Sequence, residues 1–282
     1  MLFRSKLHFL NHQGPHFKVR GPLTVMRSPQ SRPVIVQAGQ SEDGRELAAE
    51  TAEVLFAVQQ RIESAREFYA DMKRRVVAKG RAPESLLIMP GVMPVIGRSQ
   101  QEADDKFNEL NRLIHPEQGL PVLSDMVGTD LSKYPLDGPL PPKPPINTQQ
   151  GRQAVVYDLA QRENLTIREL YQRLTGQRAH RTICGTATTI ADDLEEWFRS
   201  GAADGFNIMP LIFPGGLEDI VDHLIPELQR RGLFRREYEG RTLRANLGLH
   251  TPVARKAAPQ AAPQSATQSL TQSSTQSALK SA

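Results

Sequence analysis

Residues 33–44 read Pro-Val-Ile-Val-Gln-Ala-Gly-Gln-Ser-Glu-Asp-Gly, a short apolar run followed by a turn that contains glycine. The apolar residues are consecutive and do not alternate with polar ones, which is typical of a strand covered on both faces in a parallel sheet. A segment of mixed polar and apolar residues, 45–52, follows the turn. We therefore expect the strand, turn and helix of one βα unit, with the strand at residues 33–37.

Three similar apolar runs occur further along the chain, at residues 53–57, 86–96 and 205–209. The segments between them carry helix signals, because Ser99 with Glu102 and Thr166 with Glu169 have the spacing of capping boxes. Two apolar stripes at helical spacing, at residues 190–198 and 217–228, each end before a glycine. This alternation predicts an α/β fold with a parallel sheet, in a barrel or a doubly wound arrangement.

Two stretches have a different composition. Residues 115–148 are predicted to be irregular, because prolines at this density oppose both helix and sheet; they include Pro135, Pro139, Pro141, Pro142, Pro144 and Pro145. Residues 251–282 are rich in Ala, Gln, Ser, Thr and Pro and bury too little apolar surface to offset the entropy of ordering. We expect one domain over residues 1–250 with a Pro-rich insertion at about 115–180, followed by a disordered low-complexity tail.

Charge and cysteine content limit the function classes. The net charge is +4, and Arg255, Lys256 and Lys280 supply most of it from a tail without acidic residues. The body therefore lacks the basic face expected of a nucleic-acid-binding protein. The single cysteine, Cys184, excludes an intramolecular disulfide and fits a reducing compartment. Because no apolar stretch is long enough for a signal peptide or a membrane helix, we predict a cytoplasmic protein with no membrane or nucleic-acid partner.

The turn at residues 37–44 is the strongest local candidate for a binding site. A turn after a buried parallel strand, opening into a helix N-terminus, presents free amides and the positive end of the helix dipole to an anion. Gly39 lets the backbone approach a phosphate closely, and the Ser41 hydroxyl provides a donor. Ser41 as a plain helix cap is the alternative, and the turn alone favours the cap.

The wider sequence resembles the nitrilotriacetate monooxygenase component A branch of the bacterial-luciferase superfamily, which includes dibenzothiophene-sulfone and long-chain alkane monooxygenases. The resemblance runs from about Lys6 to Leu249. It rests on blocks at residues 14–23, 32–39, 180–182, 185–186, 191–192, 204–207, 227–234, 241–244 and 246–248.

This resemblance implies a TIM (β/α)8 barrel that binds reduced FMN, supplied by a separate NAD(P)H:flavin reductase, and uses O2 to oxygenate a small organic substrate. It also implies that the turn at Ala38, Gly39, Gln40 and Ser41 contacts the flavin phosphate. A closed barrel needs eight strands and about 250 residues. The four predicted strands correspond to the fifth to eighth, so we expect the C-terminal half of a barrel, N-terminally truncated.

Two classes of function follow from this expectation. In the first, the chain is an FMN-dependent monooxygenase subunit, which works with a separately encoded N-terminal half or is a portion of a longer enzyme. Its expected partners include this missing half or a second copy of the chain in a homo-oligomer. In the second, it is a catalytically inactive truncated remnant, or a non-enzymatic flavin- or phosphate-binding fragment. The sequence identifies no catalytic acid or base, and flavin oxygenases leave much of the chemistry to the cofactor.

Other polar residues favour structural roles. His8, His12 and His16 recur every four residues, but Gly14 and Pro15 interrupt any helix, so exposed loop histidines are predicted and no metal site. His180 and Arg181 fit an anion contact or a structural ion pair. Cys184 is expected to be a small buried residue, and His115 to interact with the C-terminal end of the preceding helix.

Overall fold

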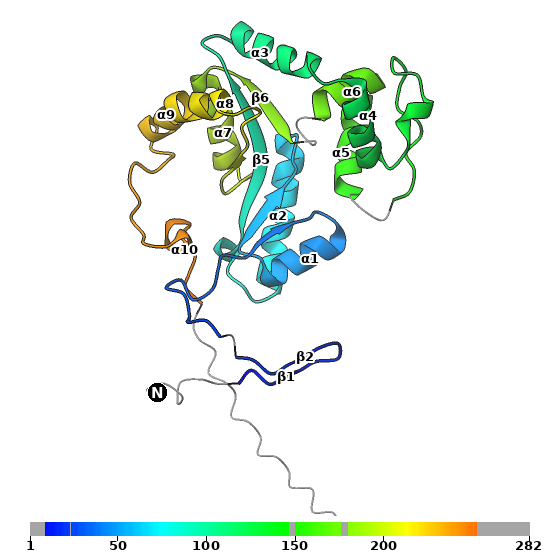
Figure 1. The fold of residues 1–282 in the computed structure, drawn as a ribbon. Helices are drawn as coiled ribbons and strands as arrows, with labels where there is room; N and C mark the ends of the chain where they lie inside the picture. The colour runs from blue at the N-terminus through cyan, green and yellow to red at the C-terminus, as the bar shows by residue number, and fades with distance from the viewer. Residues whose placement is uncertain (1–8, 23, 147–149, 176–179, 253–282) are drawn as a thin grey trace, which may run out of the picture. The chain divides into compact units, whose positions relative to one another are not determined.

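A five-stranded parallel sheet forms the centre of the described part of the chain (Figure 1). The computed structural model describes residues 9–22, 24–146, 150–175 and 180–252. The strands of this sheet are β3 (Val36–Ala38), β4 (Val54–Ala57), β5 (Leu87–Ile96), β6 (Arg181–Gly185) and β7 (Asn207–Ile208). The first four are neighbours in chain order, and β7 also pairs with β5.

The register of the sheet shows that the four predicted apolar runs are parallel neighbours. Val36 of β3 lies opposite Val54 of β4, and Val54 lies opposite Leu87 of β5. Gly91 of β5 lies opposite Asn207 of β7, and each of these pairs is parallel. The expected α/β fold with a parallel sheet is therefore present, while the numbering of its strands as the fifth to eighth of a barrel stays a prediction.

Strand β6 corrects the predicted strand count. It lies beside β5, with Val92 opposite Arg181 and Ile96 opposite Gly185. Its sequence, Arg-Thr-Ile-Cys-Gly, has no run of large apolar residues. Arg181 is buried in this strand because its charge pairs with Asp193. Apolar patterning therefore missed this strand.

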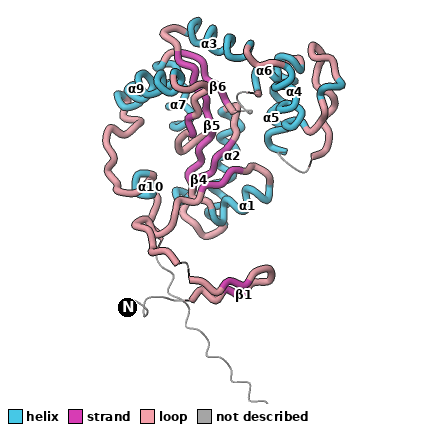
Figure 2. Tube along the Cα trace, viewed as in Figure 1, coloured by secondary structure: helices cyan, strands magenta, loops and turns pink. Residues whose placement is uncertain are grey.

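Helices cover the sheet and extend beyond it (Figure 2). Side chains of α1 and α2 pack on β4 and β5 in an apolar cluster that includes Ala48, Met72 and Ile88. A second cluster joins α7 and the 215–230 helix to β5 through Val92, Ile190 and Leu224. The helices are α1 (Glu42–Thr51), α2 (Ile62–Ala78), α3 (Gln100–Arg112), α4 (Pro116–Val127), α5 (Gln150–Glu163), α6 (Ile167–Leu174), α7 (Ala187–Arg199), α8 (Gly215–Asp219), α9 (Ile225–Arg230) and α10 (Leu243–Asn246).

The predicted irregular stretch at residues 115–148 contains a helix, which corrects that prediction. Helix α4 begins at Pro116, where the first helical position needs no N–H donor, and it includes Pro121. A short 3-10 helix follows at Leu131–Lys133. Helices α4, α5 and α6 share their own apolar cluster, with Leu123, Val156 and Leu170 fully buried. Burial of these side chains outweighs the cost of the proline within α4.

The helix predicted at residues 217–228 is interrupted by a π-helical turn at Ile220–Leu224, between α8 and α9. Pro226 has no N–H to donate to the fourth residue before it, which accounts for the local change of hydrogen-bond pattern. Fewer of the apolar residues at positions 217–228 are consequently buried than predicted. Ile220 and Leu224 are buried, whereas Leu217 and Val221 are exposed.

The sequence signals at helix ends are confirmed in part. Thr166 and Glu169 form the full capping box at the start of α6. Ser99 caps α3 by accepting from the Glu102 N–H, but the Glu102 carboxylate accepts from Arg98 instead of the cap backbone. The α7 helix ends as predicted, with Gly201 at a φ of 73°.

An N-terminal hairpin joins β1 (His12–Gln13) to β2 (Lys18–Val19) in antiparallel register. Within the described residues, no helix has the length and apolar character to cross a membrane. The predicted disordered tail at residues 251–282 lies outside the described residues, apart from Thr251 and Pro252.

Candidate functional site

The carboxyl ends of the parallel strands bring several predicted and unpredicted side chains to one edge of the sheet. In open parallel sheets and in barrels, ligand sites form at this edge, because the loops after adjacent strands meet there. The turn after β3 carries Gly39 and Ser41, and the loop after β4 carries Gln59 and Gln60. The loop after β6 leads into α7 at Thr186.

The Ala38–Ser41 turn has the geometry of a capped helix start. The Gly44 N–H donates to Oγ of Ser41 at 3.2 Å, and the Arg45 N–H donates to the Ser41 carbonyl at 2.8 Å. Nε2 of Gln37 donates to the Gly44 carbonyl at 2.8 Å and so ties the turn to β3. A Cβ on Gly39 would meet no heavy atom nearer than 3.9 Å, so the protein itself leaves open space on that side of the turn.

These residues fit a bound phosphate in some respects and oppose it in others. Ser41 accepts one hydrogen bond as a cap and keeps its hydroxyl proton for a ligand. The N-terminus of α1 adds a positive dipole end. Glu42 and Asp43, however, place two carboxylates in the first turn of the helix. Arg75 lies 2.6 Å from the Glu42 carboxylate and offsets one of them.

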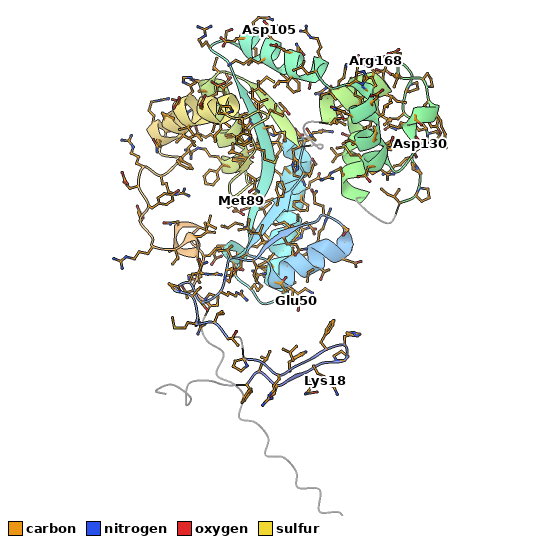
Figure 3. All side chains as sticks on the ribbon, viewed as in Figure 1. Lys18, Glu50, Met89, Asp105, Asp130 and Arg168 are labelled. Atoms are coloured by element: carbon orange, nitrogen blue, oxygen red, sulfur yellow. The ribbon has the colours of Figure 1, made fainter. Side chains whose placement is uncertain are left out.

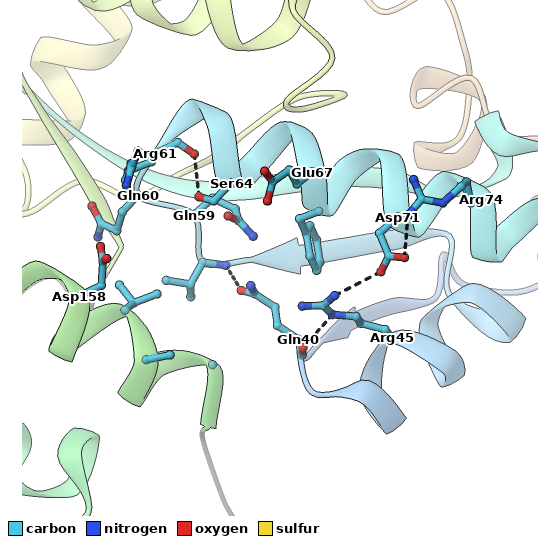
Figure 4. A pocket seen from close by; sticks show the side chains of 15 residues that line it. Gln40, Arg45, Gln59, Gln60, Arg61, Ser64, Glu67, Asp71, Arg74 and Asp158 are labelled. Atoms are coloured by element: carbon cyan, nitrogen blue, oxygen red, sulfur yellow. Dashed lines mark hydrogen bonds and ion pairs between the residues drawn. The ribbon is translucent and has the colours of Figure 1, made fainter. Parts of the chain in front are cut away.

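Gln40 connects this turn to a cavity of about 580 Å³ between α1, α2 and α5 (Figure 4). Its Oε1 accepts a hydrogen bond from the Val58 N–H at 2.6 Å, and its carbonyl accepts from Nε of Arg45 at 3.0 Å. Of the four predicted phosphate-contacting residues, Gln40 lines the cavity, whereas Ala38, Gly39 and Ser41 do not.

The charges on the cavity wall balance one another. The cations are Arg45, Arg61 and Arg74, and the carboxylates are Glu67, Asp71 and Asp158. Arg45 lies 3.2 Å from Asp71. Figure 4 marks this ion pair by a dashed line. Burial alone would raise the pKa of Asp71, but hydrogen bonds from Arg75 and Arg45 outweigh it and hold that pKa below its ordinary value. The wall therefore offers polar contacts without a strong preference for anions.

A second cavity, of about 260 Å³, borders the same loop, because Gln60 lines both. Thr182 and Cys184 of β6 form one of its walls. Burial and the nearby Asp104 carboxylate raise the pKa of Cys184 to about 11, against the opposing effect of Arg173. The thiol is thus protonated at neutral pH and is a poor nucleophile.

His180 and Arg181 pack against different elements. Arg181 lies 2.6 Å from Asp193 and 4.0 Å from the centre of the Trp197 ring, so an ion pair is what the structure shows. The His180 ring stacks on Phe56, with ring centres 4.9 Å apart. Burial, with a smaller effect from the Arg152 charge, lowers the pKa of His180 to about 4.

The other histidines singled out in the sequence are His8, His12, His16 and His115. His12 is exposed and His16 lies in the turn of the hairpin, while His8 lies outside the described residues. His115 does not interact with the end of α3 as predicted. Its Nδ1 instead accepts from the Glu117 N–H at 3.4 Å and caps α4, because Pro116 starts a new helix there. In the part of the chain that the structure describes, no three potential metal ligands come together.

Several residues at this edge were not predicted. Asp104, Arg173 and Gln60 come from two helices and a loop that are far apart in the sequence. No motif links them, and only the packing of α3 and α6 beside β6 brings them to one cavity.

Comparisons with known proteins show the family to which the chain belongs. The model of the luciferase-like monooxygenase family matches residues 2–204. Nitrilotriacetate monooxygenase component A of Aminobacter aminovorans is 50% identical over 257 residues, which is 90% of this chain and 57% of that protein. The crystal structure of DmoA from Hyphomicrobium sulfonivorans superimposes with a TM-score of 0.77 at 31% identity, covering 86% of this chain and 51% of that one.

A solved structure with a flavin is also similar. Riboflavin lyase with modified FMN and the substrate riboflavin matches with a TM-score of 0.73 at 30% identity, over 89% of this chain and 55% of that chain. The chain spans a little over half the length of the curated relatives it matches.

Proposed function

Because the chain belongs to the luciferase-like monooxygenase family, we propose that it acts in an FMN-dependent, two-component monooxygenase that oxygenates a small organic substrate with O2. A separate NAD(P)H:flavin reductase would supply reduced FMN. The observation that carries the proposal is the capped βα turn at Ala38–Ser41, which opens at the carboxyl edge of a parallel sheet beside a cavity of about 580 Å³.

The chain's own residues have defined tasks in this proposal. The Ser41 hydroxyl donates to a phosphate oxygen, and the amides of Gly39, Gln40 and Ser41 approach the same group from the backbone. Gln40, held by Val58, positions the turn against the loop after β4. When bound, reduced FMN supplies the electrons for the activation of O2, and the protein positions the reactants and excludes water.

The test is a titration of the purified chain with FMN, with Ser41→Ala as the variant. Loss of one charge-assisted hydrogen bond, worth about 1.5 to 3 kcal/mol, should weaken FMN binding roughly tenfold to a hundredfold. Ser99→Ala is the matched control, because Ser99 caps α3 by the same 3.2 Å hydrogen bond but lies outside the predicted turn.

Equal FMN dissociation constants for Ser41→Ala and the unchanged chain would exclude the phosphate role of this turn. A coupled assay with reductase, NADH and O2 then examines turnover. FMN binding without reductase-dependent oxygenation would support the alternative, a flavin-binding fragment without catalytic activity.

A further inference from the structure

The cavity beside β6 carries features that the flavin proposal does not use. It is bounded by α3, α5, α6 and β6 and has a volume of about 260 Å³. At roughly 30 Å³ for each water-sized group, it holds a ligand of about eight non-hydrogen atoms or fewer. Three apolar side chains line it, Phe107, Leu159 and Leu174. A ligand with a short hydrocarbon part fits such walls.

The same cavity presents two opposite charges that do not pair with one another. Arg173 forms its ion pair with Glu163 through Nη1. Oδ1 of Asp104 accepts from Nε2 of Gln100 at 2.9 Å, and Gln100 also donates to the Cys184 carbonyl at 3.1 Å. This contact fixes the Asp104 carboxylate next to β6. Among the described residues, Oδ2 of Asp104 and the other N–H groups of Arg173 have no hydrogen-bond partner.

Thr182 of β6 forms part of the cavity wall. Its Oγ1 is buried and does not face the open space of the cavity.

We propose that this cavity is a binding subsite for a small zwitterion, whose ammonium group contacts Asp104 and whose carboxylate contacts Arg173. The short hydrocarbon part lies against Phe107 and Leu159. A ligand with both charges contacts both side chains, whereas a ligand with one charge contacts only one of them. Because Gln60 borders both cavities, the zwitterion would lie next to the proposed flavin cavity. Its role as substrate rests on the proposed function.

Calorimetric titration of the full chain with three probes of equal length tests the proposal. β-Alanine carries both charges, propanoate only the carboxylate and propylamine only the ammonium group. We expect β-alanine to bind at least tenfold more tightly than either of the others. No heat of binding with β-alanine, or equal affinity for all three probes, would overturn the proposal.

Two variants assign the contacts. Asp104→Asn should weaken β-alanine and propylamine roughly tenfold or more while leaving propanoate unchanged, and Arg173→Gln should weaken β-alanine and propanoate instead. Asp105→Asn is the control, because Asp105 is the next residue of α3 and is exposed (Figure 3). Circular dichroism of each variant confirms folding. Uniform weakening of all three probes by a folded variant would contradict the assignment.

Failure of the zwitterion proposal can be distinguished from failure of the flavin proposal. β-Alanine binding is measured without FMN and should be the same in Ser41→Ala. Binding of the zwitterion without FMN binding would retain the subsite and reject the flavin site, and the reverse result would reject the subsite alone.

Discussion

Glu53 forms a buried ion pair with Arg244 at the amino end of β4, on the edge of the sheet away from the candidate site. Their closest atoms are 2.6 Å apart, and Arg32 and the Ile35 N–H add further hydrogen bonds to the same carboxylate. Burial alone would raise the pKa of Glu53. The hydrogen bonds from Arg244, Ile35 and Arg32 outweigh burial and lower that pKa from 4.5 to about 2.

This shift predicts an acid-dependent loss of stability. Because the pKa is lower in the folded protein, Glu53 stabilises the fold above pH 4.5, and the contribution disappears as the pH falls toward about 2. Urea unfolding across this range should show a shallower pH dependence for Glu53→Gln than for the unchanged chain. Glu50→Gln, at an exposed position of α1, is the control (Figure 3). Parallel pH profiles for the unchanged chain and Glu53→Gln would refute the assignment.

Gly91 allows three side chains to pack on the sheet. A Cβ at this position would lie 2.5 Å from Nδ1 of His180, 2.7 Å from Cε of Met209 and 2.8 Å from Cε2 of Phe56. We expect Gly91→Ala to lower the free energy of unfolding by about 1 to 3 kcal/mol, because the stacked rings must shift.

Thermal unfolding of Gly91→Ala beside Gly215→Ala provides the comparison. A Cβ on Gly215 meets no atom within 4 Å, so this second change should be neutral or slightly stabilising. If both variants melt at the temperature of the unchanged chain, the prediction that a Cβ at Gly91 disturbs the packing is contradicted.

Among the elements, α4 forms despite the proline that it contains. Pro121 is exposed, so its ring contributes little packing, while its missing N–H removes one helical hydrogen bond. We predict that Pro121→Ala stabilises the fold by roughly 1 to 3 kcal/mol. Pro116→Ala should change little, since Pro116 occupies the first turn. Chemical denaturation measures both, and a destabilising Pro121→Ala would show that the ring is needed.

At the scale of the whole molecule, the sheet has an unpaired edge. Within the described residues β3 pairs with β4 alone, and Val36 is 61% exposed. Exposed apolar edge strands favour strand addition from another chain, and a charged residue opposes it. We predict concentration-dependent self-association that Val36→Lys reduces.

Sedimentation velocity over a range of protein concentrations checks this prediction. Val77→Lys is the control, because Val77 is similarly exposed but lies on α2. A chain that stays monomeric at all concentrations, or a control that acts like Val36→Lys, would exclude association through this edge.

The sequence by itself determined the parallel sheet, because consecutive apolar residues and helix ends are local signals. The family followed separately, from the resemblance of sequence blocks along the chain. The runs at β3, β4, β5 and β7 were each found within a few residues of their observed bounds. The sequence also located the turn at Ser41, and the structure shows that Ser41 caps α1. Contact of this turn with a phosphate stays a prediction.

Only the tertiary structure decided the rest, because it depends on contacts between residues that are distant in the chain. Arg181 is buried in β6 because its guanidinium group pairs with Asp193 and lies over the Trp197 ring, both on α7. An apolar sequence pattern does not indicate these contacts. Helix α4 exists because its apolar side chains pack with α5 and α6, which outweighs local proline content. The cavity between Asp104, Arg173 and Thr182 likewise arises from packing alone, since these residues share no sequence motif.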